Sequence, residues 1–494
     1  MKISASLASV LATATAVVAS ASASNSLRIQ TSSGVIQGGV NGTYPAVRQF
    51  LGIPFAQAPV GNRRWLPPQE LNKSDSIIDA TTMPPACPQG STAMSPFGRF
   101  APETLIAGGT SEDCLTLSVW APNNAKSDLP VIVWIYGGEF TSGGTDTPAW
   151  IPSQWIQRTQ EHIVVSIQYR LNIFGFPGAR GLAEQNLGIL DQRAAIEWLQ
   201  KNIAQFGGNP DQMILWGQSA GAGSVDIQNF AYPDDPIVQG FACDSGSVFL
   251  TVDTRSTDTA GTNFSTVASH FGCSGSAADE LSCLRQVPAA NITSYLGAGG
   301  ARLTFLPFID NKVVFNNYTA RYIGGHLSNK PALFGSNLNE GTILAGGSDN
   351  AMAEAITLSG FQCPVPYSTA YRQALDLTTY RYQYRGNFSN VSPSPSLGAY
   401  HTAELPLIFG TSGDFYGANT PFEAKVSEKM QDLWLAFAKD PANGLAQQGW
   451  PKSTSNEFLM LAGEDASNKT VVSALLADSA IDDACTSYYS SYLV

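Results

Sequence analysis

The sequence is poor in charged residues and has no second long hydrophobic run after its N-terminus. Charged residues make up only 13% of the chain and apolar residues 44%, so a large core can form and an intrinsically disordered protein is excluded. No later apolar stretch is long enough to cross a bilayer, and no internal repeat or heptad is visible, which excludes a membrane bundle, a solenoid and a coiled coil. The formal net charge of −12 disfavours nucleic acids and anionic membranes as partners.

The N-terminal residues 1–23 have the pattern of a secretory signal peptide. Lys2 supplies a positive start, an apolar run follows from Leu7 to Ala19, and Ala21-Ser22-Ala23 is a suitable cleavage site. The run is short and rich in Ser and Thr, which argues against an uncleaved anchor. We therefore expect a secreted protein with no stable membrane insertion.

The cysteines and glycosylation sequons agree with secretion. Seven cysteines in a secreted chain predict three disulfides and one thiol left over, and their spacing leaves the pairing open. Asn-x-Ser/Thr sequons predict N-glycans, although the sequence leaves open which of them are occupied. The sequons begin at Asn41, Asn72, Asn263, Asn291, Asn317, Asn387, Asn390 and Asn468.

Short apolar runs alternate with helical patterns through the middle of the chain. Pro130 to Tyr136 and Ile163 to Gln168 are typical of buried strands, and Asp191 to Phe206 has helical spacing. Phe422 to Phe437 predicts an amphipathic helix that packs on the sheet. This alternation predicts the α/β class, with a single large, mostly parallel sheet and helices on both faces. No linker divides the chain, so we expect one domain over residues 24–494.

The pentapeptide from Gly217 to Gly221 has the pattern Gly-x-Ser-x-Gly. An apolar run, Met213 to Trp216, precedes it and small residues follow, so the order reads strand, tight turn, helix. In such a turn the glycines allow close packing and the central Ser219 is held in strained geometry at a helix N-terminus. This pattern is typical of the nucleophile elbow of α/β-hydrolases, so Ser219 is the candidate nucleophile.

A serine needs a base, and this chain has only four histidines. In α/β-hydrolases the order along the chain is serine, acid, histidine. His162 precedes the serine and is expected to be structural. His270 follows closely beside a cysteine, and His326 lies in a Gly-Gly-His turn before any good acid. His401, on an expected loop, is therefore the candidate base.

The acid should follow a strand between the serine and His401. Leu333 to Ser336 predicts a strand, and Glu340 lies in the turn after it, so Glu340 is the candidate that orients the imidazole. Asp310 is the second choice, with a turn role as its more ordinary interpretation.

The third requirement is a set of backbone N–H donors for the oxyanion. A Gly-Gly turn follows the strand from Pro130 directly, and it supplies Gly138 and Glu139. Ala220, which follows the nucleophile, supplies a third amide. The oxyanion hole is therefore predicted at Gly138, Glu139 and Ala220.

With these motifs in place, the chain resembles the type-B carboxylesterase family, which includes cholinesterases and fungal lipases, and most of all its secreted fungal members. The resemblance covers nearly the whole mature chain and places the family's triad on Ser219, Glu340 and His401. Its other marks are the segments Phe50 to Ala56, Glu112 to Leu115, Gly188 to Arg193 and Phe206 to Pro210.

The resemblance also implies structural pairs that the sequence leaves open. It implies disulfides Cys87–Cys114, Cys273–Cys283 and Cys363–Cys485, with Cys243 free. It further implies that Glu112 pairs with Arg64 and that Ser245 lies near the acid.

Three departures from the family bear on the substrate. Gln218 stands before the nucleophile where cholinesterases carry a carboxylate, and no Trp lies between Cys87 and Cys114 to hold a quaternary ammonium. Cholinesterase activity is therefore not expected. Glu139 replaces the third glycine of the oxyanion turn, where its backbone amide serves regardless of the side chain but the room for a bulky substrate stays open.

These observations lead to the hypothesis of a secreted serine carboxylic-ester hydrolase that acts on small neutral esters through an acyl-enzyme. No cofactor and no metal are expected. One alternative is a true lipase, because the loop from Cys87 to Cys114 would be a lid and carries apolar residues. These are Met94, Phe97, Phe100, Leu105 and Ile106. The other alternative is a non-catalytic carrier or adhesion protein of the same fold. The physiological ester and the oligomeric state stay open.

Overall fold

The structure is a computed structural model, and it describes residues 26–124, 126–250, 256–297, 303–348, 350–392, 394–464 and 470–492. The expected signal peptide, residues 1–23, lies outside these residues. Within the described ranges, no helix combines the length and the apolar character that a membrane span requires.

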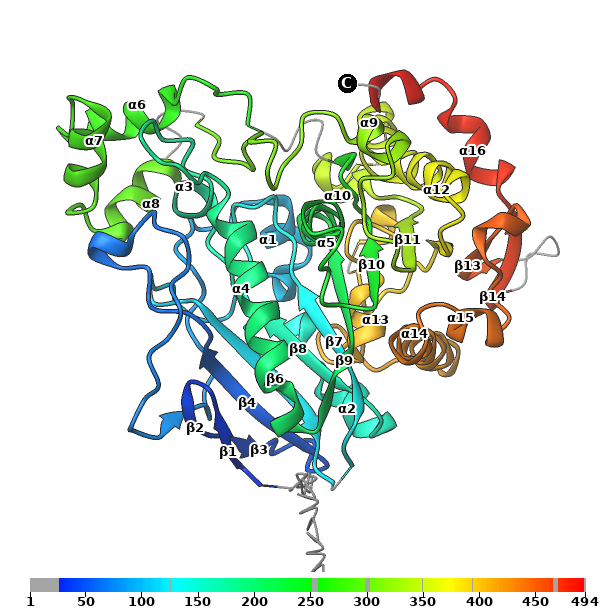
Figure 1. Ribbon diagram of the computed structural model, residues 1–494. Coiled ribbons are helices and arrows are strands. Elements are labelled where there is room, and N and C mark those ends of the chain that lie inside the picture. The colour runs from blue at the N-terminus through cyan, green and yellow to red at the C-terminus, as the bar shows by residue number, and fades with distance from the viewer. Residues whose placement is uncertain are drawn as a thin grey trace, which may run out of the picture.

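A single 11-stranded sheet forms the centre of the molecule (Figure 1). From one edge to the other its strands are β14 (Thr470–Ala477), β13 (Glu457–Glu464), β12 (Thr379–Tyr384), β11 (Ala332–Asn337), β10 (Gly240–Asp244), β9 (Gly208–Gln218), β7 (Leu129–Ile135), β8 (Ile163–Ile167), β6 (Thr116–Pro122), β4 (Val47–Pro54) and β3 (Gly39–Val40). Neighbours from β8 to β13 pair in parallel, and the strands at both edges pair antiparallel. A small separate sheet contains β1 (Arg28–Thr31), β2 (Gly34–Gln37) and β5 (Ile78–Asp79).

Helices pack against both faces of the large sheet, as the sequence predicts (Figure 1). One face carries α4 (Leu187–Asn202) and α5 (Ala220–Ala231), and the other carries α2 (Ser153–Thr159), α13 (Leu405–Phe409) and α14 (Pro421–Lys439). The remaining α-helices are α1 (Pro96–Phe100), α3 (Asn172–Gly175), α6 (Thr262–His270), α7 (Ala277–Leu284), α8 (Ala289–Gly297), α9 (Tyr318–Ile323), α10 (Gly341–Leu344), α11 (Ala351–Ile356), α12 (Pro364–Ala374), α15 (Gly444–Gln447) and α16 (Ser479–Cys485).

Aromatic side chains join the second helical layer to the sheet. The Trp216 ring of β9 stacks on Phe409 of α13 with centroids 4.9 Å apart, and its edge meets Trp434 of α14 at 6.4 Å. All three side chains are buried, so the amphipathic stripe predicted from Phe422 to Phe437 does pack on the sheet.

The connection from β9 to α5 is the tightest backbone contact in this region. A Cβ atom at Gly221 would lie 2.0 Å from the carbonyl oxygen of Ile135, at the end of β7. A Cβ at Gly217 would lie 2.4 Å from the carbonyl oxygen of Gly221. Both positions therefore require glycine, because real side chains do not approach backbone atoms so closely.

We predict that Gly221→Ala lowers the free energy of unfolding by at least roughly 1–3 kcal/mol, because α5 must move away from β7 to admit the methyl group. Thermal unfolding of the purified variant measures the effect. Gly39→Ala is the matched control, since a Cβ at Gly39 meets nothing within 4 Å. Equal midpoints for the two variants would contradict the prediction.

Candidate active site

Ser219 lies in the turn that joins β9 to α5, where its backbone angles are φ 57° and ψ −125°. Left-handed φ is unusual for a residue other than glycine and marks a strained turn. The turn is held because the Ser219 N–H donates to the carbonyl oxygen of Asp244 on the neighbouring strand at 2.9 Å. The residue is 8% exposed. The predicted strand, turn and helix around Ser219 are thus confirmed.

His401 and Glu340 are brought together, as the sequence predicts. The imidazole Nδ1 lies 2.5 Å from Oε2 of Glu340, and both side chains are buried. Glu340 lies in the turn after β11, and its other oxygen accepts the backbone N–H of Asn337 at 2.6 Å. His401 lies in a turn just before α13. A carboxylate on Nδ1 fixes the ring orientation and leaves Nε2 available as a base.

Gln218 connects this pair to the nucleophile elbow. Its side-chain nitrogen lies 3.2 Å from Nε2 and 3.3 Å from Nδ1 of His401, and Ser219 is the next residue along the chain. Two rings flank the imidazole, with centroids 4.5 Å away for Phe361 and 6.3 Å away for Phe97. Among the described residues, no hydrogen bond joins the Ser219 hydroxyl to His401. Such a bond commonly tightens only when substrate binds.

The other three histidines have other surroundings. His162 is fully buried, its Nδ1 lies 3.0 Å from the hydroxyl of Thr159, and burial lowers its pKa to about 3. It therefore stays neutral and structural, as expected. His270 is exposed and stacks on Tyr295 with centroids 3.8 Å apart. His326 is exposed in its turn.

The glycine turn after β7 lies beside Ser219. A Cβ at Gly137 would lie 2.9 Å from the Cβ of Ser219, so the turn and the elbow touch. Gly138 and Glu139 both have positive φ, at 109° and 57°. In the described part of the chain, the N–H groups of Gly138, Glu139 and Ala220 donate to no protein acceptor. Unused amides beside a serine hydroxyl are what an anionic intermediate requires.

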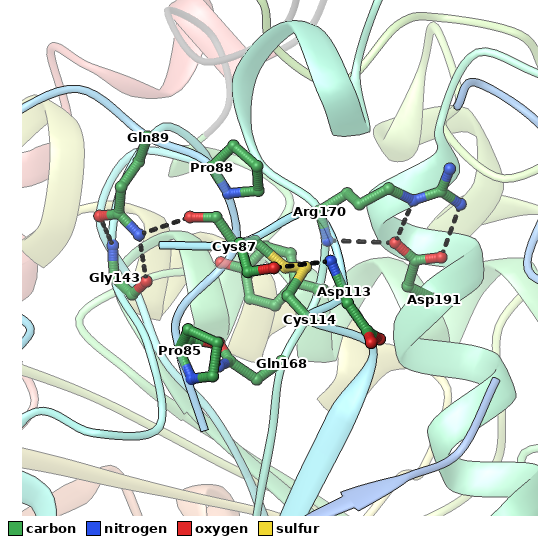
Figure 2. The surroundings of a disulfide bond; sticks show 12 residues. Pro85, Cys87, Pro88, Gln89, Asp113, Cys114, Gly143, Gln168, Arg170 and Asp191 are labelled. Carbon is green, nitrogen blue, oxygen red and sulfur yellow. Dashed lines mark hydrogen bonds and ion pairs between the residues drawn. A yellow bond between two sulfur atoms is a disulfide. The ribbon is translucent and has the colours of Figure 1, made fainter. Parts of the chain in front are cut away.

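The Cys87–Cys114 disulfide supports this turn (Figure 2). The Gln89 side chain accepts the N–H of Gly143 at 2.9 Å and donates to its carbonyl at 2.8 Å, and it also donates to the Cys87 carbonyl at 3.1 Å. The two hydrogen bonds to Gly143 fix the end of the glycine turn against the base of the disulfide loop. A further hydrogen bond holds the glycine turn, because the N–H of Asn172 donates to the Phe140 carbonyl at 2.8 Å.

The pairs that the resemblance implies are largely present. The disulfides Cys87–Cys114, Cys273–Cys283 and Cys363–Cys485 form, and Cys243 is free and buried. Arg64 makes two hydrogen bonds of 2.6 Å to Glu112. The motif from Gly188 to Arg193 supplies Asp191, which binds Arg170 through both carboxylate oxygens (Figure 2).

Two further predictions concerned residues near the acid. Asp310 has the turn role given as its ordinary interpretation, since its carboxylate accepts the backbone N–H groups of Lys312, Val313 and Val314. Ser245 follows β10 and its N–H donates to Gly335 of β11. Within the described ranges its buried hydroxyl has no hydrogen-bond partner, so contact with Glu340 stays a prediction.

Two buried carboxyl groups accompany Glu340 and were missed by the sequence reasoning. Oδ2 of Asp244 accepts the indole N–H of Trp216 at 2.6 Å, and burial raises the Asp244 pKa to about 7. Glu404 accepts a hydrogen bond from the side chain of Asn337, and burial together with the charge of Glu340 raises its pKa well above the usual range. Both groups therefore hold a proton more tightly than exposed carboxyls do.

No group of three or more His, Cys, Asp or Glu side chains that could hold a metal ion is found within the described residues. The chemistry available here is that of a serine, an imidazole oriented by a carboxylate and unused backbone amides.

Comparison with known proteins gives consistent matches along the chain. The model of the carboxylesterase family matches residues 25–349 and 345–474. A chlorogenic acid esterase of Aspergillus niger is 44% identical over 484 residues, which cover 93% of this chain and 94% of that enzyme. The secreted lipase 5 of Gibberella zeae is 41% identical over 93% of this chain and 94% of its own length. An acetylcholinesterase of Bungarus fasciatus is 29% identical over 83% of this chain and 78% of its own.

The raised pKa of Asp244 predicts a pH-dependent stability. In the unfolded chain an Asp titrates near pH ~3.9. Below that pH Asp244 is protonated in both the folded and the unfolded state, so its titration does not change the free energy of unfolding. As pH rises toward about 7, only the unfolded state has lost the proton, so unfolding is favoured progressively. We expect Asp244→Asn to raise the unfolding midpoint at pH 8, and to raise it much less at pH 4.

Thermal unfolding of both proteins across pH 4–8 measures this difference. Asp211→Asn is the matched control, because Asp211 is exposed and its removal takes away the same charge. A stability gain for Asp244→Asn that is the same at pH 4 and pH 8 would refute the titration as its cause.

Proposed function

The chain belongs to the carboxylesterase family and is a carboxylic ester hydrolase, and we propose that it cleaves neutral esters through Ser219, His401 and Glu340. One observation supports the triad above all: His401 is bound to Glu340 through Nδ1, and its ring also contacts the side chain of Gln218, the neighbour of Ser219. A base oriented by a carboxylate beside a serine in a strained turn is the arrangement that acyl transfer needs.

In the proposed mechanism, Ser219 Oγ attacks the carbonyl carbon of the ester while Nε2 of His401 takes its proton. The negative oxygen of the tetrahedral intermediate accepts hydrogen bonds from the N–H groups of Gly138, Glu139 and Ala220, each worth roughly 10²–10³ in rate. The imidazolium then donates its proton to the departing alcohol, which leaves an acyl-Ser219 ester. Water attacks this ester with His401 as base, and the carboxylic acid leaves.

Glu340 stabilises the imidazolium by its charge and holds the ring without taking the proton itself. We further propose that the enzyme is secreted after removal of residues 1–23 and carries N-glycans. Close relatives that are named as secreted enzymes support an extracellular location. The substrate we propose is a small uncharged ester, because Gln218 offers no charge to a cationic alcohol.

A true lipase is the second candidate, and two observations favour it. The relative of 41% identity is named a secreted lipase. In the loop closed by Cys87 and Cys114, α1 brings Phe97 against His401, while Met94 is 96% exposed. An apolar loop that touches the base and also faces solvent could meet a lipid surface.

Replacing the nucleophile or the base tests the triad. We predict that Ser219→Ala and His401→Ala each lower kcat on 4-nitrophenyl butyrate by at least about 10³-fold. Ser219→Ala should leave thermal unfolding nearly unaltered, whereas His401→Ala removes the partner of the buried Glu340 and should lower the unfolding midpoint. His270→Ala is the control, because His270 is an exposed histidine away from the elbow. Retained hydrolysis by Ser219→Ala would overturn the assignment.

A second measurement separates esterase from lipase. We expect the rate on soluble short-chain esters to follow ordinary saturation and to exceed the rate on emulsified long-chain triacylglycerols. A sharp rise in rate once substrate passes its solubility limit would instead identify a lipase.

A further inference from the structure

Glu139 combines a strained backbone with a charged side chain at the oxyanion turn. Its φ is 57°, and Phe140 follows with φ 59°. Glycine adopts this backbone without strain, whereas a residue with a Cβ does not. Non-glycine residues in such angles persist where the surrounding structure imposes them, and they concentrate at functional sites.

The surrounding turn fixes the position of Glu139. The carbonyl of Gly138 accepts the N–H groups of Thr141 and Ser142 at 2.9 and 3.0 Å. The far end of the turn is held by the double hydrogen bond between Gln89 and Gly143 (Figure 2). The Cα of Glu139 therefore has little freedom, and the base of its side chain stays where the turn places it.

The carboxylate itself has no structural role among the described residues. The side chain is exposed and makes no hydrogen bond or ion pair there. The single basic residue between Cys87 and Cys114 is Arg99, which lies over the Phe100 ring at 4.9 Å and is not paired with Glu139. The charge at this corner of the site is thus left uncompensated by a direct partner.

Covalent geometry keeps this charge close to the reacting atoms. The carboxyl carbon is four bonds of about 1.5 Å from the backbone nitrogen, so it lies within ~6 Å of that atom in any rotamer. If that N–H binds the oxyanion at ~3 Å, the carboxylate lies within ~9 Å of it. This is about one screening length at physiological salt.

We propose that Glu139 is a specificity-determining residue that disfavours esters carrying a carboxylate, so that the substrate class of this site is the uncharged ester. This rests on the proposed function, since it places the substrate at the amide of Glu139. A second negative charge on the substrate, in its acyl or alcohol part, is repelled before and during the reaction. An uncharged ester of the same shape meets only the repulsion on the oxyanion, which both esters share.

The expected size of the effect follows from Coulomb's law. A substrate carboxylate that lies about as far from Glu139 as the oxyanion does, at ~9 Å, is repelled by an amount that corresponds to about twofold in rate in a water-like medium and about twentyfold at the effective dielectric of a protein surface. We therefore expect a preference of about three- to tenfold in kcat/KM at low ionic strength. Salt should reduce it, because the carboxylate is exposed.

The test compares two esters that differ mainly by one charge: chlorogenate, whose quinate carboxylate is ionised, and its methyl ester. Release of caffeate is measured at pH 7 in 10 mM and 500 mM salt. For the unaltered enzyme we expect a higher kcat/KM on the methyl ester, with a ratio that shrinks in high salt. In Glu139→Gln the ratio at low salt should fall by about three- to tenfold.

The ratio of the two kcat/KM values is insensitive to a general change in the oxyanion hole, because such a change alters kcat/KM for both esters equally. Asp211→Asn removes the same charge at the far end of β9 and should leave the ratio unaltered. Glu139→Gly, which suits the positive φ, replaces Glu139→Gln if the latter folds poorly. An unaltered, salt-independent ratio in both Glu139 variants overturns the proposal. By contrast, an enzyme that hydrolyses neither these esters nor 4-nitrophenyl butyrate, or retained hydrolysis by Ser219→Ala, would show that the proposed function is wrong.

Discussion

The close approach of α5 to the end of β7 is the contact on which the candidate site depends. There is no room for a Cβ atom between Gly221 and the carbonyl oxygen of Ile135. Helix α5, which begins after Ser219, therefore lies directly against the end of β7, just before the glycine turn. Two segments far apart in sequence are thereby joined backbone to backbone. The serine and the unused amides of Gly138 and Glu139 owe their proximity to this packing rather than to any side-chain bond.

A second constraint on the site is the group of buried carboxyl side chains around Glu340. Its carboxylate is fully buried between the Asn337 amide and His401, and it shares its surroundings with Asp244 and Glu404. Placing several carboxyl groups in one dry region is tolerable only if protons remain on some of them. The raised pKa values of Asp244 and Glu404 show which groups keep their protons. Loss of these protons at higher pH would therefore place further negative charge beside Glu340.

Much of the fold and the main side chains of the site could be predicted, because they rest on local patterns. The buried strands and the amphipathic helix α14 follow from periodicity, and the elbow around Ser219 follows from glycine chemistry. The pairing of His401 with Glu340 followed from chain order and elimination, which only four histidines made possible.

Other contacts carry no local signal. Gln89 reaches Gly143 across 54 residues and the Gln218 amide reaches His401 across 183, and nothing near either glutamine marks it as a positioning group. In the sequence Asp244 is an ordinary acidic residue at the end of a strand. Its complete burial follows only from the packing of Trp216 and its neighbours around it. The exposed edge strand β14 also escaped notice, because its residues lack a clean alternation of buried and exposed positions.

The Cys363–Cys485 bond has a consequence for how the enzyme matures. The two cysteines are 122 residues apart, and the closed segment contains His401, whereas Ser219 and Glu340 lie outside it. His401 thus belongs to a covalently closed ring, and Ser219 and Glu340 belong to the rest of the chain. Closing a long ring removes much of the freedom of the unfolded segment. Forming this bond therefore restricts the segment that carries His401, whereas the same chain in a reducing solution has to order that segment without the restraint.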